Sequence, residues 1–172
     1  MKRMAAILLL ILLLLSVCGC KRSPDTAQFQ VSFYYLRSVL TYGQADSVIA
    51  PEVLDGIDRE SSLNYLMALY LNGPTDNRLY SPFPKDLEIQ SIQRDGSTLT
   101  IMVNDSLAKL KGMKLTKACA CLALTCLDLT DAETVSIQAA TELLNNQKSI
   151  DLTRDSLVLL DTAETPEFGG NS

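Results

Sequence analysis

The fold of this chain is decided by residues 58–86, which read DRESSLNYLMALYLNGPTDNRLYSPFPKD. Apolar residues recur there with the 3.6-residue period of a helix that buries one face. These residues are Leu63, Leu66, Met67, Tyr70 and Leu71. The pattern predicts an amphipathic helix with Asp58 as its N-cap and Glu60 in its first turn, where the helix dipole favours negative charge.

The end of this helix is marked by two residues. Gly73 can adopt the left-handed conformation that closes a helix, and Pro74 cannot continue one. The segment SPFP, residues 81–84, then keeps the backbone extended ahead of the next strand. A helix of this kind is common in domains that mix helices and strands. The fold must therefore be identified from the segments around it.

Composition narrows the range of functions. The chain has 172 residues, a formal net charge of −5 and no histidine. Its length predicts one domain with additional ends. Without histidine, Ser-His-Asp and Cys-His catalytic sets and histidine-based metal sites are excluded. The acidic balance, without a basic stripe, argues against nucleic acid as a partner.

The N-terminus has the features of a secretory signal peptide. Lys2 and Arg3 precede an apolar run from Ala5 to Val17, which is shorter than the roughly 20 residues that a membrane-spanning helix needs. The sequence Val-Cys-Gly-Cys that ends at Cys20 resembles the lipobox of bacterial lipoproteins, which predicts lipidation of Cys20. A cleaved signal with chance cysteines and an uncleaved membrane anchor are the alternatives.

This reading divides the chain into four parts: a signal peptide (1–19), a lipid-anchored leader (20–28), a folded domain (29–161) and a disordered tail (162–172). Loss of the signal peptide removes Lys2 and Arg3, so the net charge changes from −5 to −7. The mature protein is expected on the extracytoplasmic face of the cell membrane, held there by its acyl chains, such as palmitate.

Alternation of apolar and polar residues predicts the remaining elements of the domain. They are a strand at 30–36, a short edge-like strand at 47–49, a hairpin of 87–93 with 98–104 around Asp95-Gly96, a helix at 113–127, a strand at 135–139 and a last strand at 156–160. Two helices with a mostly antiparallel sheet predict an α+β fold, a two-layer sandwich.

Several short motifs in this order resemble one known family. They follow the lipobox and are FYYL at 33–36, LNGP at 71–74, SPFP at 81–84, the pair Asp95-Gly96, ALTCL at 123–127 and VSI at 135–137. Together they resemble the GerMN domain of sporulation and spore germination, which occurs in lipoproteins of Gram-positive bacteria. The resemblance covers about residues 30–137. Family members often carry a glycine after the last of these strands, whereas Ala139-Ala140-Thr141 stands here.

The resemblance implies a fold similar to the small ring-building modules of membrane-spanning secretion assemblies. It also implies a scaffolding role at the sporulation septum or envelope, without catalysis and without a cofactor. The partners would be other envelope proteins or further copies of the chain.

Three cysteines lie in the second predicted helix, at 119, 121 and 126. Two cysteines separated by one residue point about 200° apart on a helix, so they cannot both bind one metal ion. Cys119 and Cys126 lie two turns apart, which is too far for a disulfide. We therefore interpret all three as small buried hydrophobic residues, and predict no metal site.

Ser106 and Lys109 match the S-x-x-K motif of penicillin-binding enzymes. The motif has meaning only with a Ser-Asp-Asn and a Lys-Thr-Gly elsewhere, and the chain has neither. The acidic groups Asp55/Asp58/Glu60 and Asp128/Asp131/Glu133 lack the spacing of a calcium loop. They are interpreted as caps and solvated turns, so no catalytic residue is predicted.

Aromatic residues are the candidates for an interface. The five considered are Tyr34, Tyr65, Tyr70, Tyr80 and Phe83. Tyr65 and Tyr80 fall outside the buried stripe of the first helix, so they and Phe83 are the candidate contact residues. The alternative is that these rings pack in the core and at its rim.

Three functions can be weighed on this basis. The first is a non-enzymatic, lipid-anchored envelope domain that binds proteins. The second is a lipoprotein that binds a small ligand, although such proteins usually need two lobes and a longer chain. The third is a cell-wall-associated hydrolase, which lacks a complete motif here. An exposed edge strand with an aromatic patch favours the first, and a deep pocket with converging polar groups favours the others.

Overall fold

The computed structural model describes residues 29–39, 47–58 and 60–157, and the structural statements below concern these residues. The predicted lipidation site Cys20, the leader and the tail 162–172 lie outside them. Within the described part, no helix is both long and apolar enough to cross a membrane.

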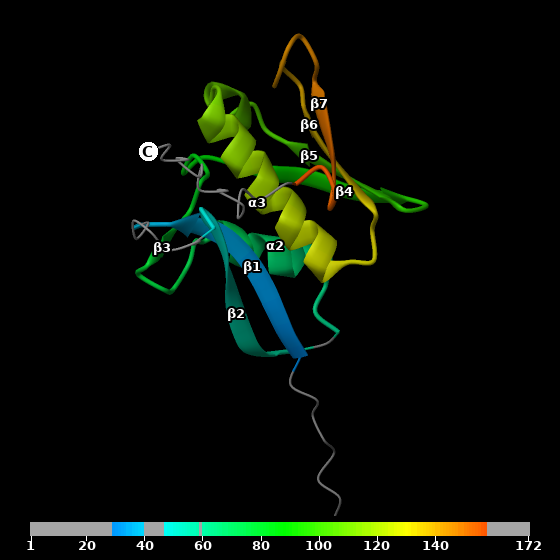
Figure 1. The fold of residues 1–172 in the computed structure, drawn as a ribbon. Helices are drawn as coiled ribbons and strands as arrows, with labels where there is room; N and C mark the ends of the chain where they lie inside the picture. The colour runs from blue at the N-terminus through cyan, green and yellow to red at the C-terminus, as the bar shows by residue number, and fades with distance from the viewer. Residues whose placement is uncertain (1–28, 40–46, 59, 158–172) are drawn as a thin grey trace, which may run out of the picture.

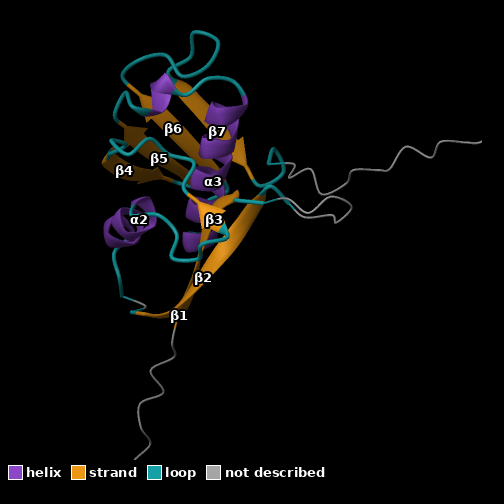
Figure 2. Cartoon of the chain, turned by 90° about the vertical axis from the view of Figure 1, so that its left-hand side faces the viewer, coloured by secondary structure: helices purple, strands orange, loops and turns teal. Residues whose placement is uncertain are grey.

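The strands form two sheets that lie on either side of one long helix (Figures 1 and 2). In chain order the elements are β1 (Phe29–Arg37), β2 (Ile49–Ile57), α2 (Leu63–Leu71), β3 (Leu79–Tyr80), β4 (Ile89–Asp95), β5 (Thr98–Val103), the 3₁₀ helix η1 (Leu107–Lys109), α3 (Met113–Leu129), β6 (Thr134–Ala139) and β7 (Ser149–Thr153). The prediction of an α+β fold with two helices and mostly antiparallel strands is confirmed.

The predicted single sheet is divided in two. One sheet has the strand order β2-β1-β3, and the other has the order β4-β5-β6-β7. Only β5 and β6 run parallel, because η1 and α3 form the crossover between them. Strand alternation shows which face of a strand is buried but not which strand is its neighbour, so the division could not be predicted.

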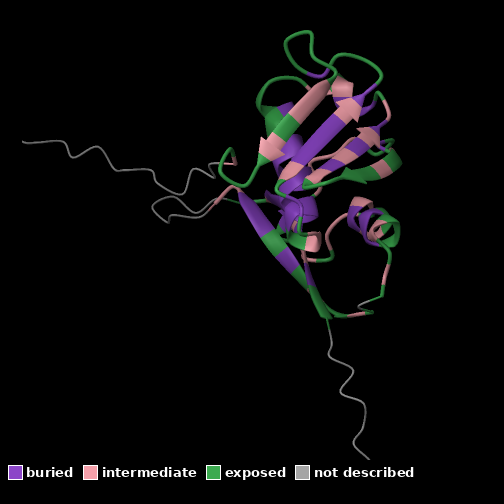
Figure 3. Ribbon diagram, turned by 90° about the vertical axis from the view of Figure 1, so that its right-hand side faces the viewer, coloured by how far each residue is buried: buried purple, intermediate pink, exposed green. Residues whose placement is uncertain are grey.

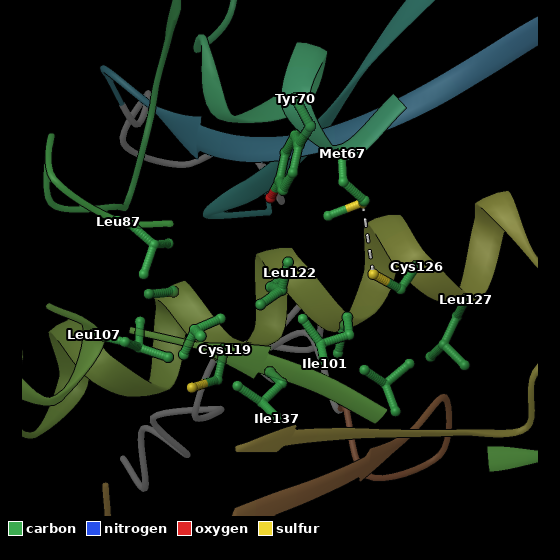
Figure 4. Close-up of a cluster of buried hydrophobic side chains, with 14 of the residues drawn as sticks. Met67, Tyr70, Leu87, Ile101, Leu107, Cys119, Leu122, Cys126, Leu127 and Ile137 are labelled. Atoms are coloured by element: carbon green, nitrogen blue, oxygen red, sulfur yellow. Dashed lines mark hydrogen bonds between the residues drawn. The ribbon is translucent and has the colours of Figure 1, made fainter. Parts of the chain in front are cut away.

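The core lies where both sheets and α2 meet α3 (Figure 3). Eleven residues of α3 are buried, so this helix is covered on most sides, as its apolar sequence predicts. Figure 4 shows Met67 and Tyr70 of α2 above Leu122 and Cys126 of α3. Cys126 Sγ lies 3.8 Å from Met67 Sδ, which places α2 directly on α3.

The predicted N-cap of α2 is wrong. Ser62 is the N-cap, with extended backbone (φ −66°, ψ 148°), and its hydroxyl oxygen accepts a hydrogen bond from the Tyr65 amide at 3.3 Å. Asp58 instead accepts from the Glu60 amide at 3.0 Å, within the turn before the helix. Glu60 therefore lies outside the first helical turn.

The predicted helix stop is confirmed. Asn72 is the C-cap, and Gly73 follows it with φ +92°, its amide donating to the Tyr70 carbonyl at 3.1 Å. The turn beyond is fixed to β2 by the buried Glu52. One carboxylate oxygen of Glu52 accepts from the Thr75 amide (2.8 Å), the Thr75 hydroxyl (2.6 Å) and the Asp76 amide (2.8 Å).

Gly73→Val should destabilise the domain through backbone strain alone. A Cβ at this position would meet only Ser81 Cβ, at 4.0 Å, so there is space for it. The positive φ still costs an L-residue about 1–2 kcal/mol, which should lower the melting temperature by several degrees. Asn72→Val, one residue earlier with φ −64°, is the control and should lower it less. An equal loss in both variants in thermal unfolding would contradict this explanation.

Two strands differ from their predicted bounds. Of the short edge-like segment predicted at 47–49, only Ile49 belongs to β2, which continues through Pro51 to Ile57. The proline is tolerated because β2 is an edge strand that pairs only with β1. The hairpin loop is Gly96-Ser97 rather than Asp95-Gly96, because Asp95 pairs with Thr98. Gly96 has φ +57°, as the first loop residue of a type II′ turn requires.

The predicted last strand at 156–160 is wrong where it can be compared. Ser156 lies in a turn, and its hydroxyl donates to the Thr153 carbonyl at 2.8 Å. Residues Val158–Leu160 lie outside the described residues. The last described strand is β7, residues 149–153, paired antiparallel with β6. Asn145 and Asn146 precede it with positive φ, a conformation that asparagine tolerates better than most residues.

Candidate protein-binding site

The three cysteines of α3 are buried and free, as predicted. Burial raises the pKa of Cys119 and of Cys121 to about 12, and it raises the pKa of Cys126 as well. A thiol with so high a pKa is protonated at neutral pH, so it is a poor nucleophile and a poor metal ligand. Among the described residues, no group of three or more cysteine, aspartate or glutamate side chains is placed to hold a metal ion.

Ser106 and Lys109 do come together, but around a carboxylate. Ser106 Oγ donates to Asp86 Oδ2 at 2.8 Å, and Lys109 Nζ donates to the same oxygen at 2.6 Å. Their hydrogen bonds lower the pKa of Asp86, which makes it a weak base. Lys109 Nζ also donates to Ser106 Oγ at 3.3 Å, so it acts as a donor to both groups. The arrangement fastens η1 to the loop before β4, and it lacks the free base that a nucleophilic serine needs.

The two acidic groups were interpreted as caps and solvated turns, but three of their members form side-chain pairs with residues distant in sequence. Asp128 accepts from the Tyr34 hydroxyl (2.6 Å) and from Arg154 Nη2 (2.6 Å), so it joins β1, α3 and the end of β7. Asp131 pairs with Arg94 of β4. In the other group, Asp55 accepts from Gln30 at 2.6 Å.

Tyr34, Tyr35 and Tyr70 form a hydrogen-bonded group between β1 and α2. The Tyr70 hydroxyl donates to the Tyr34 carbonyl (2.8 Å), and the Tyr35 hydroxyl donates to the Tyr70 carbonyl (2.7 Å). Tyr70 is fully buried, so it cannot belong to an exposed aromatic surface. Burial, followed by the hydrogen bond to Asp128, raises the pKa of Tyr34 to about 12. Burial also raises the pKa values of Tyr35 and Tyr70.

We expect stability to fall in alkaline solution because of these tyrosines. Unfolded tyrosines ionise near pH 10, whereas Tyr34 in the folded state ionises near pH 12. The stabilisation is therefore fully present below pH 10 and is lost as the pH rises from 10 through 12. Urea unfolding midpoints between pH 8 and 12 measure the effect, and Tyr34→Phe should give a shallower decline. A midpoint independent of pH across this range would refute the expectation.

The three candidate contact residues lie apart from one another. Tyr65 is exposed on α2 and lines a shallow hollow with Gly56–Asp58 and Ser61. Tyr80 is exposed on β3 and lines a different hollow, beside Lys114 and Lys117 of α3. Phe83 is half-buried, and its ring packs edge-on against Tyr70 with centroids 5.4 Å apart. Tyr65 and Tyr80 thus offer two separate contact points, and Phe83 also supports the core.

A groove between α2 and β4 was not identified from the sequence. Its volume is about 670 Å³. The α2 wall is Asn64, Met67, Ala68 and Leu71, which share one helix face, and the other wall is the run of residues 87–92. Successive residues of a strand point to opposite faces of its sheet. A groove lined by every residue of such a run therefore faces the edge of the strand and not one of its faces.

Among the described residues, one edge of β4 is unpaired, and its stretch 89–93 carries neither a proline nor a charged side chain. Within the part of the chain that the structure describes, β4 pairs with β5 alone and is the first strand of its sheet. Residues 89–93 read IQSIQ, without a charge or a proline, and all of them are exposed or half-exposed. Natural edge strands are commonly blunted by lysine, proline or a covering element. β2 has such a proline, Pro51, whereas the only device in this part of β4 is the irregularity between Ile89 and Ser91.

The sequence patterns of the two walls of this groove are local, so they do not show that the walls face each other. The run IQSIQ lies within the predicted strand 87–93, whereas Ala68 was not singled out. That the two face each other follows from the packing of α2 on α3, which no local pattern encodes.

Residues 32–143 match the family Germane, described as sporulation and spore germination. Among curated proteins, no match was found. The fold is similar to the tandem GerMN domains of the sporulation protein GerM from Bacillus subtilis, with a TM-score of 0.55 and 19% sequence identity over 80% of this chain.

The chain spans about half (49%) of the length of that GerM structure. A second solved structure, described as a lipoprotein from Clostridium perfringens, has a TM-score of 0.46 and 14% identity, and the match covers 74% of this chain and 89% of that one.

Proposed function

This chain belongs to the Germane family of sporulation and spore germination, and from that premise we propose that it is a non-enzymatic, lipid-anchored scaffold of the cell envelope. It binds an extended segment of another envelope protein, or of a second copy, in the groove between α2 and β4. Lipidation at Cys20 holds it on the extracytoplasmic face of the membrane. The role belongs to sporulation or germination.

The open edge of β4 beside the groove carries this proposal. In an antiparallel hairpin, every second residue of a strand has its amide and carbonyl directed away from the partner strand. Those groups on β4 can pair with an added strand, which supplies binding energy through main-chain hydrogen bonds. The α2 wall, with Met67 and Leu71, provides apolar surface for the side chains of that strand.

The chemistry of the other candidate sites supports binding rather than turnover. The Ser106 hydroxyl donates a hydrogen bond to Asp86, and the cysteines are buried and protonated. Anchoring on a membrane raises the local concentration of copies, so contacts that are weak in solution can still assemble a scaffold.

The proposal is tested by photo-crosslinking on intact cells. A photoreactive residue is placed at Gln90 in the groove, and separately at Tyr65 and at Tyr80. Adducts from Gln90 to a membrane protein or to a second copy are expected. Ala68→Arg should abolish most of them, because it fills the groove with a bulky charge while keeping a good helix former on an exposed site. Asn72→Arg, exposed at the end of the same helix outside the groove, should leave them unchanged.

A turnover assay on cell-wall fragments accompanies this experiment. Saturable hydrolysis that Ser106→Ala abolishes would overturn the non-enzymatic role. Adducts from Gln90 that persist unchanged in Ala68→Arg would overturn the groove as the binding site.

A further inference from the structure

A second groove lies on another part of the molecule. Its volume is about 380 Å³, and it is bounded by the N-terminal half of α3, by β7 and by the residues that lead into β2. Its apolar lining comprises Met113, Cys119, Leu144, Ile150, Leu152 and Leu157, among others. Met113 is 65% exposed and Leu144 is 43% exposed, so this lining is open at the surface of the described chain. Apolar surface of this kind gains about 25 cal/mol for each Å² that is covered.

The described part of the chain ends inside this groove. Leu157, the last described residue, is one of the lining residues. The sequence continues with Val158, Leu159 and Leu160, and the next residue is Asp161. Three residues of extended chain span roughly 10 Å, so this apolar run can cover the groove without any further linker.

Charge around the groove matches the sequence that follows the apolar run. Lys117 lines the groove, and Lys114 lies with it in the adjoining hollow beside Tyr80. The first turn of α3 has no acidic residue, although the helix dipole favours negative charge there. Beyond Leu160 the chain carries Asp161, Glu164 and Glu167 and no lysine or arginine.

We propose that Val158–Leu160 occupy this groove within the same chain, with the acidic residues from Asp161 onward lying near Lys114 and Lys117. Covalent attachment gives the segment a millimolar or higher effective concentration at the groove, which a free competitor must exceed. The segment then closes the domain beyond β7 and covers the N-terminal half of α3. This inference concerns a different surface from the groove at β4 and does not depend on the proposed function.

Cys119 is a natural reporter for the occupant, because it lines the groove and is otherwise buried. The experiment measures alkylation rates in the full-length chain in detergent, with each cysteine resolved by peptide mass spectrometry. The test variant is Leu159→Asp with Leu160→Asp. The matched control is Thr162→Asp with Ala163→Asp, which adds the same charge beyond the apolar run. Cys126, fully buried against Met67, is the internal reference.

We expect the test variant to accelerate alkylation of Cys119 roughly tenfold through local opening, while Cys126 and the control variant stay unchanged. An unchanged rate at Cys119 would overturn the proposal. An equal acceleration at Cys119 and Cys126 would also overturn it, because that result indicates loosening of the whole domain.

A photoreactive residue at Leu159 identifies the occupant directly. Adducts with the peptide that contains Met113 in the same chain are expected. Adducts with a second copy or with lipid would contradict occupation within the chain.

Discussion

Replacing Cys20 with alanine should leave the protein either uncleaved, with residues 1–19 retained, or released from the membrane. The reason is the lipobox-like sequence that ends at Cys20 after a short apolar run. Each buried CH₂ of an acyl chain contributes about 0.8 kcal/mol to membrane binding. Stable anchoring needs two acyl chains, or one chain together with a basic patch.

Intact-mass analysis of membrane and soluble fractions measures this result. The protein without substitutions should begin at Cys20 and carry acyl groups. Cys18→Ala is the matched control, and its product should have the same start and the same lipid. A mature chain that begins elsewhere and carries no acyl group would contradict the assignment.

Tyr70→Ala should lower the free energy of unfolding by about 4 kcal/mol, within the range for loss of a large buried aromatic side chain. The Tyr70 ring is fully buried and packs near Phe33, Tyr35 and Phe83, with centroid distances of 5.0–5.4 Å. The variant also removes the donor to the Tyr34 carbonyl. So large a loss is a substantial part of the roughly 5–15 kcal/mol that stabilise a typical domain.

Tyr70→Phe separates packing from hydrogen bonding in this prediction. It keeps the ring and loses only the donor to Tyr34, so it should cost about 1 kcal/mol. Urea denaturation of both variants measures the difference. A loss in Tyr70→Phe as large as that in Tyr70→Ala would show that the hydrogen bond, and not the ring, holds α2 against β1.

The parts of the fold that sequence predicts are those that local chemistry determines. The apolar run of α3 predicts burial on most sides of the helix, as the structure has it. Gly73 ends α2 because glycine adopts positive φ more readily than any other residue type. Asp58 and Ser62 are both residue types that cap helices well, although only Asp58 was predicted as the N-cap. Only the path of the chain out of β2 decides between them.

The candidate site was harder to predict because it depends on neighbours distant in sequence. Residues 89–93 were recognised as part of a strand, but nothing local to them states that they form an edge. The edge exists because β5 pairs with β6 on its other side, through the crossover of α3. Ser106 and Lys109 show the converse, because a recognisable motif was explained by one distant residue, Asp86.

Amide hydrogen exchange at residues 89–93 tests most directly whether this domain binds a partner by strand pairing at β4. The measurement compares the protein in native membranes, with its partners present, to the purified protein in detergent. We predict slower exchange at β4 in the membranes, and no such difference in Ala68→Arg. Equal exchange at β4 in both preparations, with protection confined to other elements, would contradict the claim.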